Sequence, residues 1–377
     1  MIRMVYPYIS IFANGLNVDV KTLSMGLTLR AGVGALGPFL AYFADNRGRK
    51  FGMLLGLSIF TVGTGLVVLW PIFPVFILTL ILTLLGNLVF IPAMQAYLGD
   101  RVAYNRRGRA LAITELSWSI SFIIAVPLLG LLIARAGWQA PFSVITVLGI
   151  LSIVVLSILI PKDLVAREST PSLFHNLRKV LTYSPAIAGL LMGAAMSSAN
   201  ELVNLTFGVW MEDSFGVKIA ALALASIVIG VSELAGEGVV AVFGDKIGKT
   251  RAIAIGLILN ALAALALPWI GGSLVGSLVG LSLFYLTFEF AIVSSIPLMT
   301  EVMPSARATL MATWIASISL GRALGAFLAP SIYQAGIISG IFMIVVCAVG
   351  FNILAFLALR WVKISNPQVN EGSTAPG

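Results

Sequence analysis

Seven charged residues stand inside long apolar stretches of this 377-residue chain. A charged side chain in such a stretch is costly, so it marks a proton pathway, a solute contact or a fixed ion pair that only holds packing. Carboxylates suit proton transfer and arginines suit anions. These candidate proton or substrate groups are Arg30, Glu115, Glu201, Glu233, Glu237, Glu289 and Arg322.

The spacing of two of these carboxylates places them on the same side of one helix. Glu233 and Glu237 are four residues apart and therefore lie on one face of a helix. Carboxylates that share a dry site cannot easily all ionise, so such a group titrates as a unit. We therefore predict proton coupling through carboxylates in the membrane helices, with Glu289 as the competing proton or substrate site.

The elements that position these residues are membrane helices. Hydrophobic residues make up 59% of the chain and charged residues 10%, which is typical of a polytopic membrane protein and not of a soluble domain. A spanning helix needs roughly 20 mostly apolar residues. The segments that qualify are about 1–18, 22–44, 51–70, 73–98, 110–134, 139–160, 184–209, 219–243, 250–269, 274–300, 308–333 and 337–362.

The basic residues predict the orientation of these segments. Most Lys and Arg residues fall in loops on one side, and that side is expected to be cytoplasmic. We therefore expect a multi-pass protein of the cytoplasmic membrane, embedded in the lipid bilayer, with both termini in the cytoplasm. The net charge of +8 reflects this topology, so no nucleic-acid partner is predicted.

An internal repeat predicts two similar halves. An apolar run ending in Asp45, Gly48 and Arg49 returns 200 residues later as Asp245, Gly248 and Lys249. A repeat of this kind is typical of transporters built from two related bundles. We predict domains at 1–160 and 184–363, a cytoplasmic linker at 161–183 and a disordered tail at 364–377.

Enzyme chemistry has little support in the chain. The segment Gly32-Val33-Gly34-Ala35-Leu36-Gly37 matches a dinucleotide fingerprint by letter, but it lies mid-membrane without the strand–turn–helix unit that this motif requires. Cys347 is the only cysteine, so neither a disulfide nor a cysteine metal site can form. We predict no enzyme activity, no cofactor and no metal.

Several loops resemble those of the major facilitator superfamily (MFS) of transporters. The turn Ala44-Asp45-Asn46-Arg47-Gly48-Arg49-Lys50 resembles the signature between helices 2 and 3, and Gly99-Asp100 with Arg107-Gly108-Arg109-Ala110 resembles the loop before helix 5. The second half has a counterpart at Glu301 to Ala308. The resemblance implies the MFS fold: an all-α protein of twelve transmembrane helices in two pseudo-symmetric six-helix bundles, with helices 1, 4, 7 and 10 lining a central cavity.

The resemblance also implies roles for the repeated turn and for the membrane charges. It places the two aspartates of the turn against helix ends of the other half, so we expect a conformational gate that forms only when the cytoplasmic side is closed. Glu115 and Glu237 are expected to face one another across the halves, and Glu201 to pair with Arg30 or Arg322. The gate residues are Asp45, Gly48, Arg49, Asp100, Asp245, Gly248, Lys249 and Glu301.

These observations predict a secondary active transporter that works by alternating access. We expect a small organic solute, proton coupling, export slightly favoured over uptake, and function as a monomer. Two alternatives remain open: an uptake symporter or facilitator for a metabolite, and a transporter-like sensor or assembly subunit that moves no solute. Trp314 is expected to face lipid or to pack against neighbouring helices more readily than to line a cavity.

Overall fold

The computed structural model describes residues 2–40, 48–101, 114, 117, 119–161, 173–335 and 340–363, without the side chains of 96, 99, 100, 173, 244, 245 and 308. Every regular element within these residues is a helix. Asp45, Glu115, the tail 364–377 and the side chains of Asp100 and Asp245 lie outside this description.

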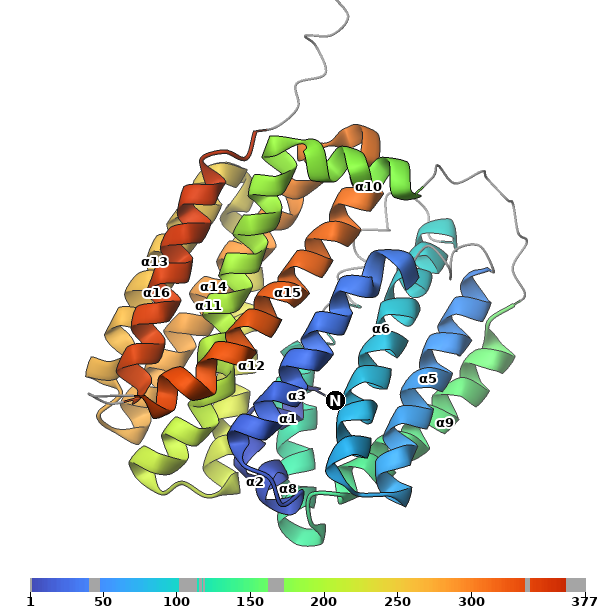
Figure 1. Cartoon of the computed structure of the whole chain (residues 1–377), viewed down its shortest axis with the longest axis vertical. Coiled ribbons are helices and arrows are strands. Elements are labelled where there is room, and N and C mark those ends of the chain that lie inside the picture. The colour runs from blue at the N-terminus through green and yellow to red at the C-terminus, as the bar shows by residue number, and fades with distance from the viewer. Residues whose placement is uncertain are drawn as a thin grey trace, which may run out of the picture.

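The first half of the chain forms one bundle (Figure 1). Helix α5 packs between α6 and α9, and α6 also contacts α3. The elements of this half are α1 (Ile2–Val5), α2 (Ile9–Gly15), α3 (Val20–Val33), η1 (Gly34–Leu36), α5 (Arg49–Leu69), α6 (Phe73–Arg101), η2 (Ser121–Ala125), α8 (Val126–Ala136) and α9 (Ala140–Leu159).

The second half forms the other bundle, in which α11 packs against α15 and α16, and α14 against α12 and α13. The halves meet where α3 and η1 contact α15, and where η2 and α8 contact α12. The elements are α10 (Leu173–Thr182), α11 (Ser184–Phe215), α12 (Ile219–Ile247), α13 (Lys249–Ile270), α14 (Leu274–Val302), η3 (Pro304–Ala306), α15 (Arg307–Gln334) and α16 (Gly340–Leu359).

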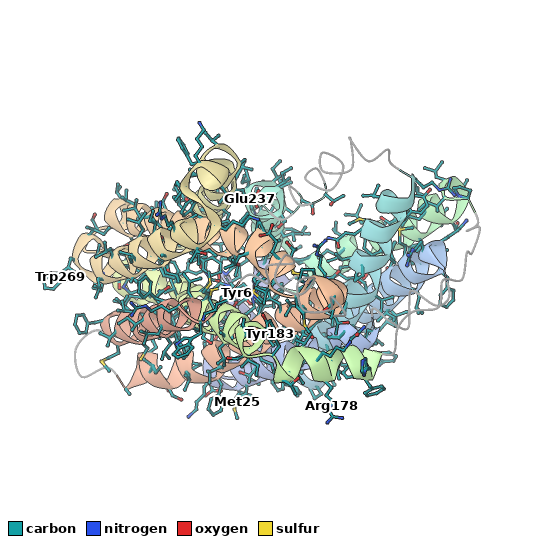
Figure 2. The ribbon with its side chains drawn as sticks, turned by 90° about the horizontal axis from the view of Figure 1, so that it is seen from above. Tyr6, Met25, Arg178, Tyr183, Glu237 and Trp269 are labelled. Carbon is teal, nitrogen blue, oxygen red and sulfur yellow. The ribbon has the colours of Figure 1, made fainter. Side chains whose placement is uncertain are left out.

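Apolar side chains cover the outside of both bundles. Met25 is 56% exposed and Trp269 is 81% exposed, and both point outward from the perimeter in Figure 2, whereas Tyr6 lies near the middle. A surface of this kind needs a hydrocarbon solvent. Ten helices in the described residues are long and apolar enough to cross a membrane, and Ser121–Ala136 forms a shorter apolar helix. The protein is therefore a multi-pass membrane protein.

The N-terminal segment differs from the predicted spanning helix over 1–18. It forms two short helices, α1 and α2, that are separated at Tyr6, Pro7 and Tyr8. Pro7 has no backbone N–H to donate and its ring disfavours a helical residue before it, so the helix breaks there. The N-terminal end lies part-way along the bundle and not at either of its ends, so α1 lies away from the turns that begin α5 and α13 (Figure 1).

The glycine that ends the repeated turn has a similar backbone conformation in both halves. Gly48 precedes α5 with φ 102°, and Gly248 precedes α13 with φ 86°. L-residues with a side chain rarely adopt this conformation, which explains why glycine occupies both positions. We call the end of the bundle that carries these two turns and the C-terminal residue of α16 the basic end.

Candidate functional site

A cavity of about 700 Å³ lies between the two halves. On α12 and α14 it extends to Ala241 and Ile296, each about 9 Å from the helix end at the basic side. The lining comes mainly from the second half and consists of Ile2, Arg3, Tyr6, Phe122, Ser197, Asn200, Asn204, Glu233, Leu234, Glu237, Gly238, Ala241, Tyr285, Phe288, Glu289, Ile292, Val293, Ile296, Trp314, Ile318 and Arg322.

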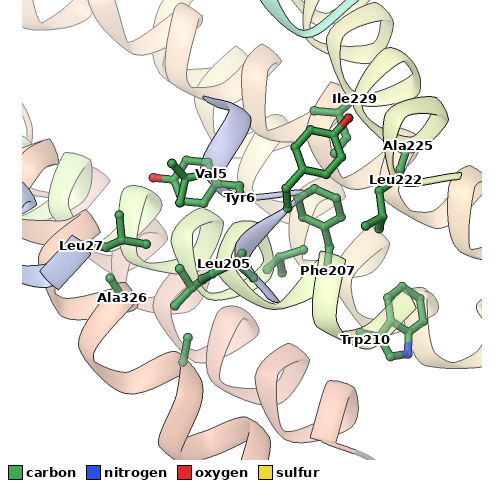
Figure 3. Packing of buried hydrophobic residues seen from close by; sticks show 14 of the residues in the cluster. Val5, Tyr6, Leu27, Leu205, Phe207, Trp210, Leu222, Ala225, Ile229 and Ala326 are labelled. Atoms are coloured by element: carbon green, nitrogen blue, oxygen red, sulfur yellow. The ribbon is translucent and has the colours of Figure 1, made fainter. Parts of the chain in front are cut away.

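The opposite end of the cavity is closed by packed side chains. Val5 and Tyr6 lie among α11 and α12 residues that are almost fully buried, including Leu205, Phe207 and Leu222 (Figure 3). Beyond this plug, aromatic rings of α2, α6 and α9 pack with centroids 5.6–6.2 Å apart. Each such pair contributes about 0.5–1.5 kcal/mol beyond its buried area. Among the described residues, the central site therefore extends toward the basic end and is closed at the opposite end.

Three polar contacts join the halves at this site, and each pairs a donor of the first half with a carboxylate of the second. Arg3 Nη1 lies 2.5 Å from Glu233 Oε2, and the guanidinium also lies 4.4 Å from the Phe122 ring centroid. The Tyr6 hydroxyl donates to Glu201 Oε1 at 2.7 Å. Ser119 Oγ donates to Glu237 Oε1 at 3.3 Å. Because they bridge the bundles, these contacts must change if the halves move apart.

Phe122 reaches the cavity from a π-helical turn. Residues Ser121–Ala125 form η2, and Pro127 follows within the first turn of α8. A proline cannot donate to the carbonyl four residues before it, so the regular ladder is interrupted there. Single π turns of this kind are frequent at functional sites because they re-aim side chains.

The structure gathers the predicted trio of Arg30, Glu201 and Arg322. Both arginines interact electrostatically with Glu201 and with Tyr6. The predicted ion pair is not formed: among the described residues no arginine pairs with Glu201, and Tyr6 provides the hydrogen bond instead. Glu201 Oε2 and Arg30 Nε are buried and have no hydrogen-bond partner. The trio is thus an incompletely paired polar cluster at the wall of the cavity, which Arg322 lines.

The predicted carboxylates of α12 and α14 share the cavity. Glu289 interacts electrostatically with both Glu233 and Glu237. The expected partner of Glu237 across the halves, Glu115, lies outside the described residues, and Ser119 of the same segment contacts Glu237. The three carboxylates therefore lie in one cavity, and their role in proton transfer stays a prediction.

Several cavity residues were not singled out from the sequence. Arg3 and Tyr6 had no signal, because the first segment was expected to be a continuous helix. Asn200 and Asn204 did have a signal in the sequence. Together with Ser197 and Glu201 they recur at helical spacing inside an apolar run, which indicates one polar face of a helix. Asn204 accepts a hydrogen bond from the Tyr285 hydroxyl at 2.8 Å, which fixes both side chains.

Two further expectations are corrected. Trp314 lines the cavity and is 4% exposed, so it does not face lipid. Of the helices expected to line the cavity, α6, the fourth spanning segment, contributes no residue among those described, whereas α12 and α15 do. The reason is that the interface between the halves is built from helices that meet directly, α3 with α15 and α8 with α12.

The gate residues behave differently in the two halves. Lys249 at the start of α13 forms an ion pair with Glu301 near the end of α14. Both belong to the second half, and the pair is present while the cavity extends toward the basic end. The expected contact between Lys249 and Glu301 is thus formed, while its dependence on closure of the basic end stays a prediction. Arg49 is the first residue of α5, two residues before the predicted start of that segment, and its gating with Asp45 and Asp100 involves groups outside the described residues.

The comparisons with known proteins identify the class. The family model of the Major Facilitator Superfamily matches residues 1–308, so the chain belongs to this superfamily. This assignment makes the protein a transporter and not an enzyme, with the all-helical MFS fold.

Relatives and solved structures agree with this assignment. The MFS-type transporter YceJ of Bacillus subtilis (strain 168) is 23% identical over 300 residues, 77% of this chain and 74% of that protein. A citrate-proton symporter of Klebsiella pneumoniae is 26% identical, covering 80% of this chain and 71% of the relative. The match to YwfA of Bacillus subtilis spans only 31% of that protein.

The fold is similar to that of a solved bacterial homologue of the human lysosomal transporter Spinster. That structure is in an inward-facing and unoccupied conformation. The TM-score is 0.75 at 16% identity, over 97% of this chain and 95% of that one.

Proposed function

We propose that this protein is a proton-coupled secondary transporter that moves a small organic solute across the cytoplasmic membrane by alternating access. The observation that carries the proposal is a mid-bundle cavity in which carboxylates of the second half meet donors of the first. The basic end would be cytoplasmic, since basic residues are retained on that side. The protein would work as a monomer, because the cavity is formed within one chain.

Proton coupling follows from the electrostatics of the cavity. Glu289 interacts electrostatically with both Glu233 and Glu237, so the charge on each of these carboxylates affects the others and the three would act as one group. Protonating Glu233 would weaken its ion pair with Arg3, and that pair joins the halves. Proton binding and movement of the halves are thereby linked through one contact, as an equilibrium shift requires.

The relatives support transport of an organic solute with a proton. One is named a citrate-proton symporter, and a neighbour of known structure is named the human organic anion transporter MFSD10, with a TM-score of 0.68 at 18% identity. The proposal takes from them only the class of process, because these identities are low.

Flux measurements in proteoliposomes test the proposal. Purified protein would be reconstituted, a pH gradient applied in either direction, and solute accumulation followed for a panel of organic acids, amines and zwitterions. We expect the gradient to drive movement of at least one class, and Glu289→Gln, Glu237→Gln and Glu233→Gln to reduce gradient-driven flux. Asp213→Asn, an exposed carboxylate outside the cavity, is the control. Gradient-driven flux that survives in all three cavity variants would refute proton coupling and favour a facilitator.

A further inference from the structure

Two opposite charges in the cavity lack a partner. Glu289 on α14 and Arg322 on α15 both line it, and neither forms a hydrogen bond or an ion pair within the described part of the chain. They interact electrostatically with each other but do not lie within ion-pair distance. The other cavity charges differ, since Arg3 holds Glu233 and Ser119 donates to Glu237.

These two charges lie at the same depth. At 1.5 Å per residue, Glu289 is about 20 Å from the end of α14 at the basic side, and Arg322 is about 22 Å from the start of α15. Glu233 lies at about 21 Å on α12 by the same measure. The two unpaired charges therefore belong to one layer of the cavity and can be contacted by one small molecule.

Neutral donors gather on the side of Arg322. Ser197 and Asn200 of α11 line the cavity at about 20 and 24 Å from the basic end. They are 1% and 5% exposed, and Ser197 Oγ and Asn200 Nδ2 have no hydrogen-bond partner. A buried donor without a partner is destabilising, and an acceptor on a bound molecule would satisfy it. Arginine with neutral donors matches the requirements of a carboxylate.

Other parts of the cavity wall are apolar. Phe288, Ile318 and Trp314 line the cavity beside the charged layer. Its volume of about 700 Å³ falls in the range of small-molecule sites, roughly 300–1,000 Å³. A bound solute would thus meet an acidic group, a basic group with donors, and an apolar or aromatic body between them.

We propose that the solute is an amphipathic zwitterion, an amino-acid-like or dipeptide-like molecule whose carboxylate binds Arg322, Asn200 and Ser197 and whose ammonium group binds Glu289. This inference rests on the proposed function and names the substrate class of the same cavity. A pure anion would leave Glu289 buried beside it, and a pure cation would leave Arg322 uncompensated. Both arrangements are penalised, because an unpaired charge in a dry site is costly.

A matched ligand series tests this inference without any variant. Thermal stabilisation of the purified full-length protein would be measured with L-phenylalanine and leucyl-phenylalanine, with their N-acetyl forms and with their methyl esters. Binding to the native state raises the apparent stability by mass action. We expect at least one zwitterion to bind at least tenfold more tightly than both of its blocked forms. Equal binding of a blocked form, or no binding by either zwitterion, overturns the proposal.

Variants then assign the two ends. Glu289→Gln should remove the discrimination against the N-acetyl form, and Arg322→Gln should remove the discrimination against the methyl ester. Asp213→Asn and Arg251→Gln change exposed charges outside the cavity and should keep both preferences. Preferences that persist in the cavity variants overturn the assignment.

The outcome is separable from that of the proposed function. Proton-driven flux of a pure anion or cation, with no zwitterion bound, refutes the substrate class alone. Zwitterion binding without any proton-driven flux refutes proton coupling alone.

Discussion

Removing the Tyr6 hydroxyl should shift the protein away from the state open at the basic end. Tyr6 precedes the break in the first segment and moves with the first half, because α1 contacts η2 and α8. Its hydroxyl donates to Glu201 Oε1 of the second half at 2.7 Å, and Glu201 is 2% exposed. The hydrogen bond therefore stabilises this arrangement of the halves and is lost when they separate there.

The size of the shift follows from the burial of the carboxylate. Glu201 Oε2 already has no partner, so Tyr6→Phe withdraws the tyrosine donor from a buried group. The loss of a buried hydrogen bond of this kind costs about 1–3 kcal/mol. Because about 1.4 kcal/mol is a tenfold change, the ratio of the two states should change by about 5- to 150-fold.

Spin-label distances measure this shift. Trp70 and Trp269 lie at the ends of α5 and α13 away from the basic end, one in each half, and are 57% and 81% exposed. Cysteines at these two positions, in a background in which Cys347 is replaced by Ser, carry the labels. Tyr6→Phe should increase the population with the longer label distance, since that end opens as the other closes.

Tyr8→Phe is the matched control. The Tyr8 hydroxyl donates to the Val126 carbonyl at 3.3 Å, and both residues belong to the first half, so the same deletion should leave the label distances unchanged. If Tyr6→Phe and Tyr8→Phe give the same distance distribution, the hydrogen bond to Glu201 does not bias the two states and the reasoning fails.

Four further predictions concern other parts of the molecule. Gly248→Ala should lower the free energy of unfolding by about 1–3 kcal/mol, because φ is 86° at this position. Gly272→Ala, where a Cβ meets nothing within 4 Å, is the control. Equal melting temperatures of the two variants would contradict the expectation. Gly193→Ala places a Cβ 2.6 Å from Trp314 Nε1, so it should displace the indole ring and weaken solute binding. Gly350→Ala, where a Cβ meets nothing within 4 Å, is the control and should leave the affinity unchanged. An unaltered affinity in Gly193→Ala would show that the ring relaxes freely. Hydrogen bonds from Thr22 lower the pKa of Asp19 at the start of α3. The cap therefore stabilises the helix at pH values above the ordinary carboxyl pKa, and this stabilisation is lost as the pH falls through the lowered pKa. The melting-temperature difference between the parent and Asp19→Ala should shrink in acid, and a difference that stays constant with pH would contradict the expectation. Glu301→Gln should leave the Trp70–Trp269 label distances unchanged, because the ion pair of Glu301 with Lys249 lies within one half. Asp45→Asn, at the turn of the first half, should favour the state open at the basic end. The reverse pattern would instead assign the gating role to Lys249 and Glu301.

The amino-acid sequence alone determined the class, the repeat and the membrane segments of this protein. Spanning helices depend on local composition, so ten of the predicted segments appear as helices long enough to cross a membrane. The repeat was visible in the sequence because the same residue types recur, and the structure adds that Gly48 and Gly248 both have a positive φ, a local requirement that glycine meets. The cost of a buried charge likewise marked Glu233, Glu237 and Glu289 before their surroundings were known.

Only the tertiary structure decided which of these groups meet. The hydrogen-bond donor to Glu201 is Tyr6 and not an arginine, and Arg3 forms an ion pair with Glu233, which lies 230 residues later in the chain. Contacts of this kind depend on how helices far apart in the chain are rotated and packed against one another. In a membrane helix that rotation is poorly recorded in the sequence, because apolar residues cover both its lipid-facing and its buried sides. The break at Pro7 shows the same limit, since hydropathy detected an apolar segment there but not its place within the bundle.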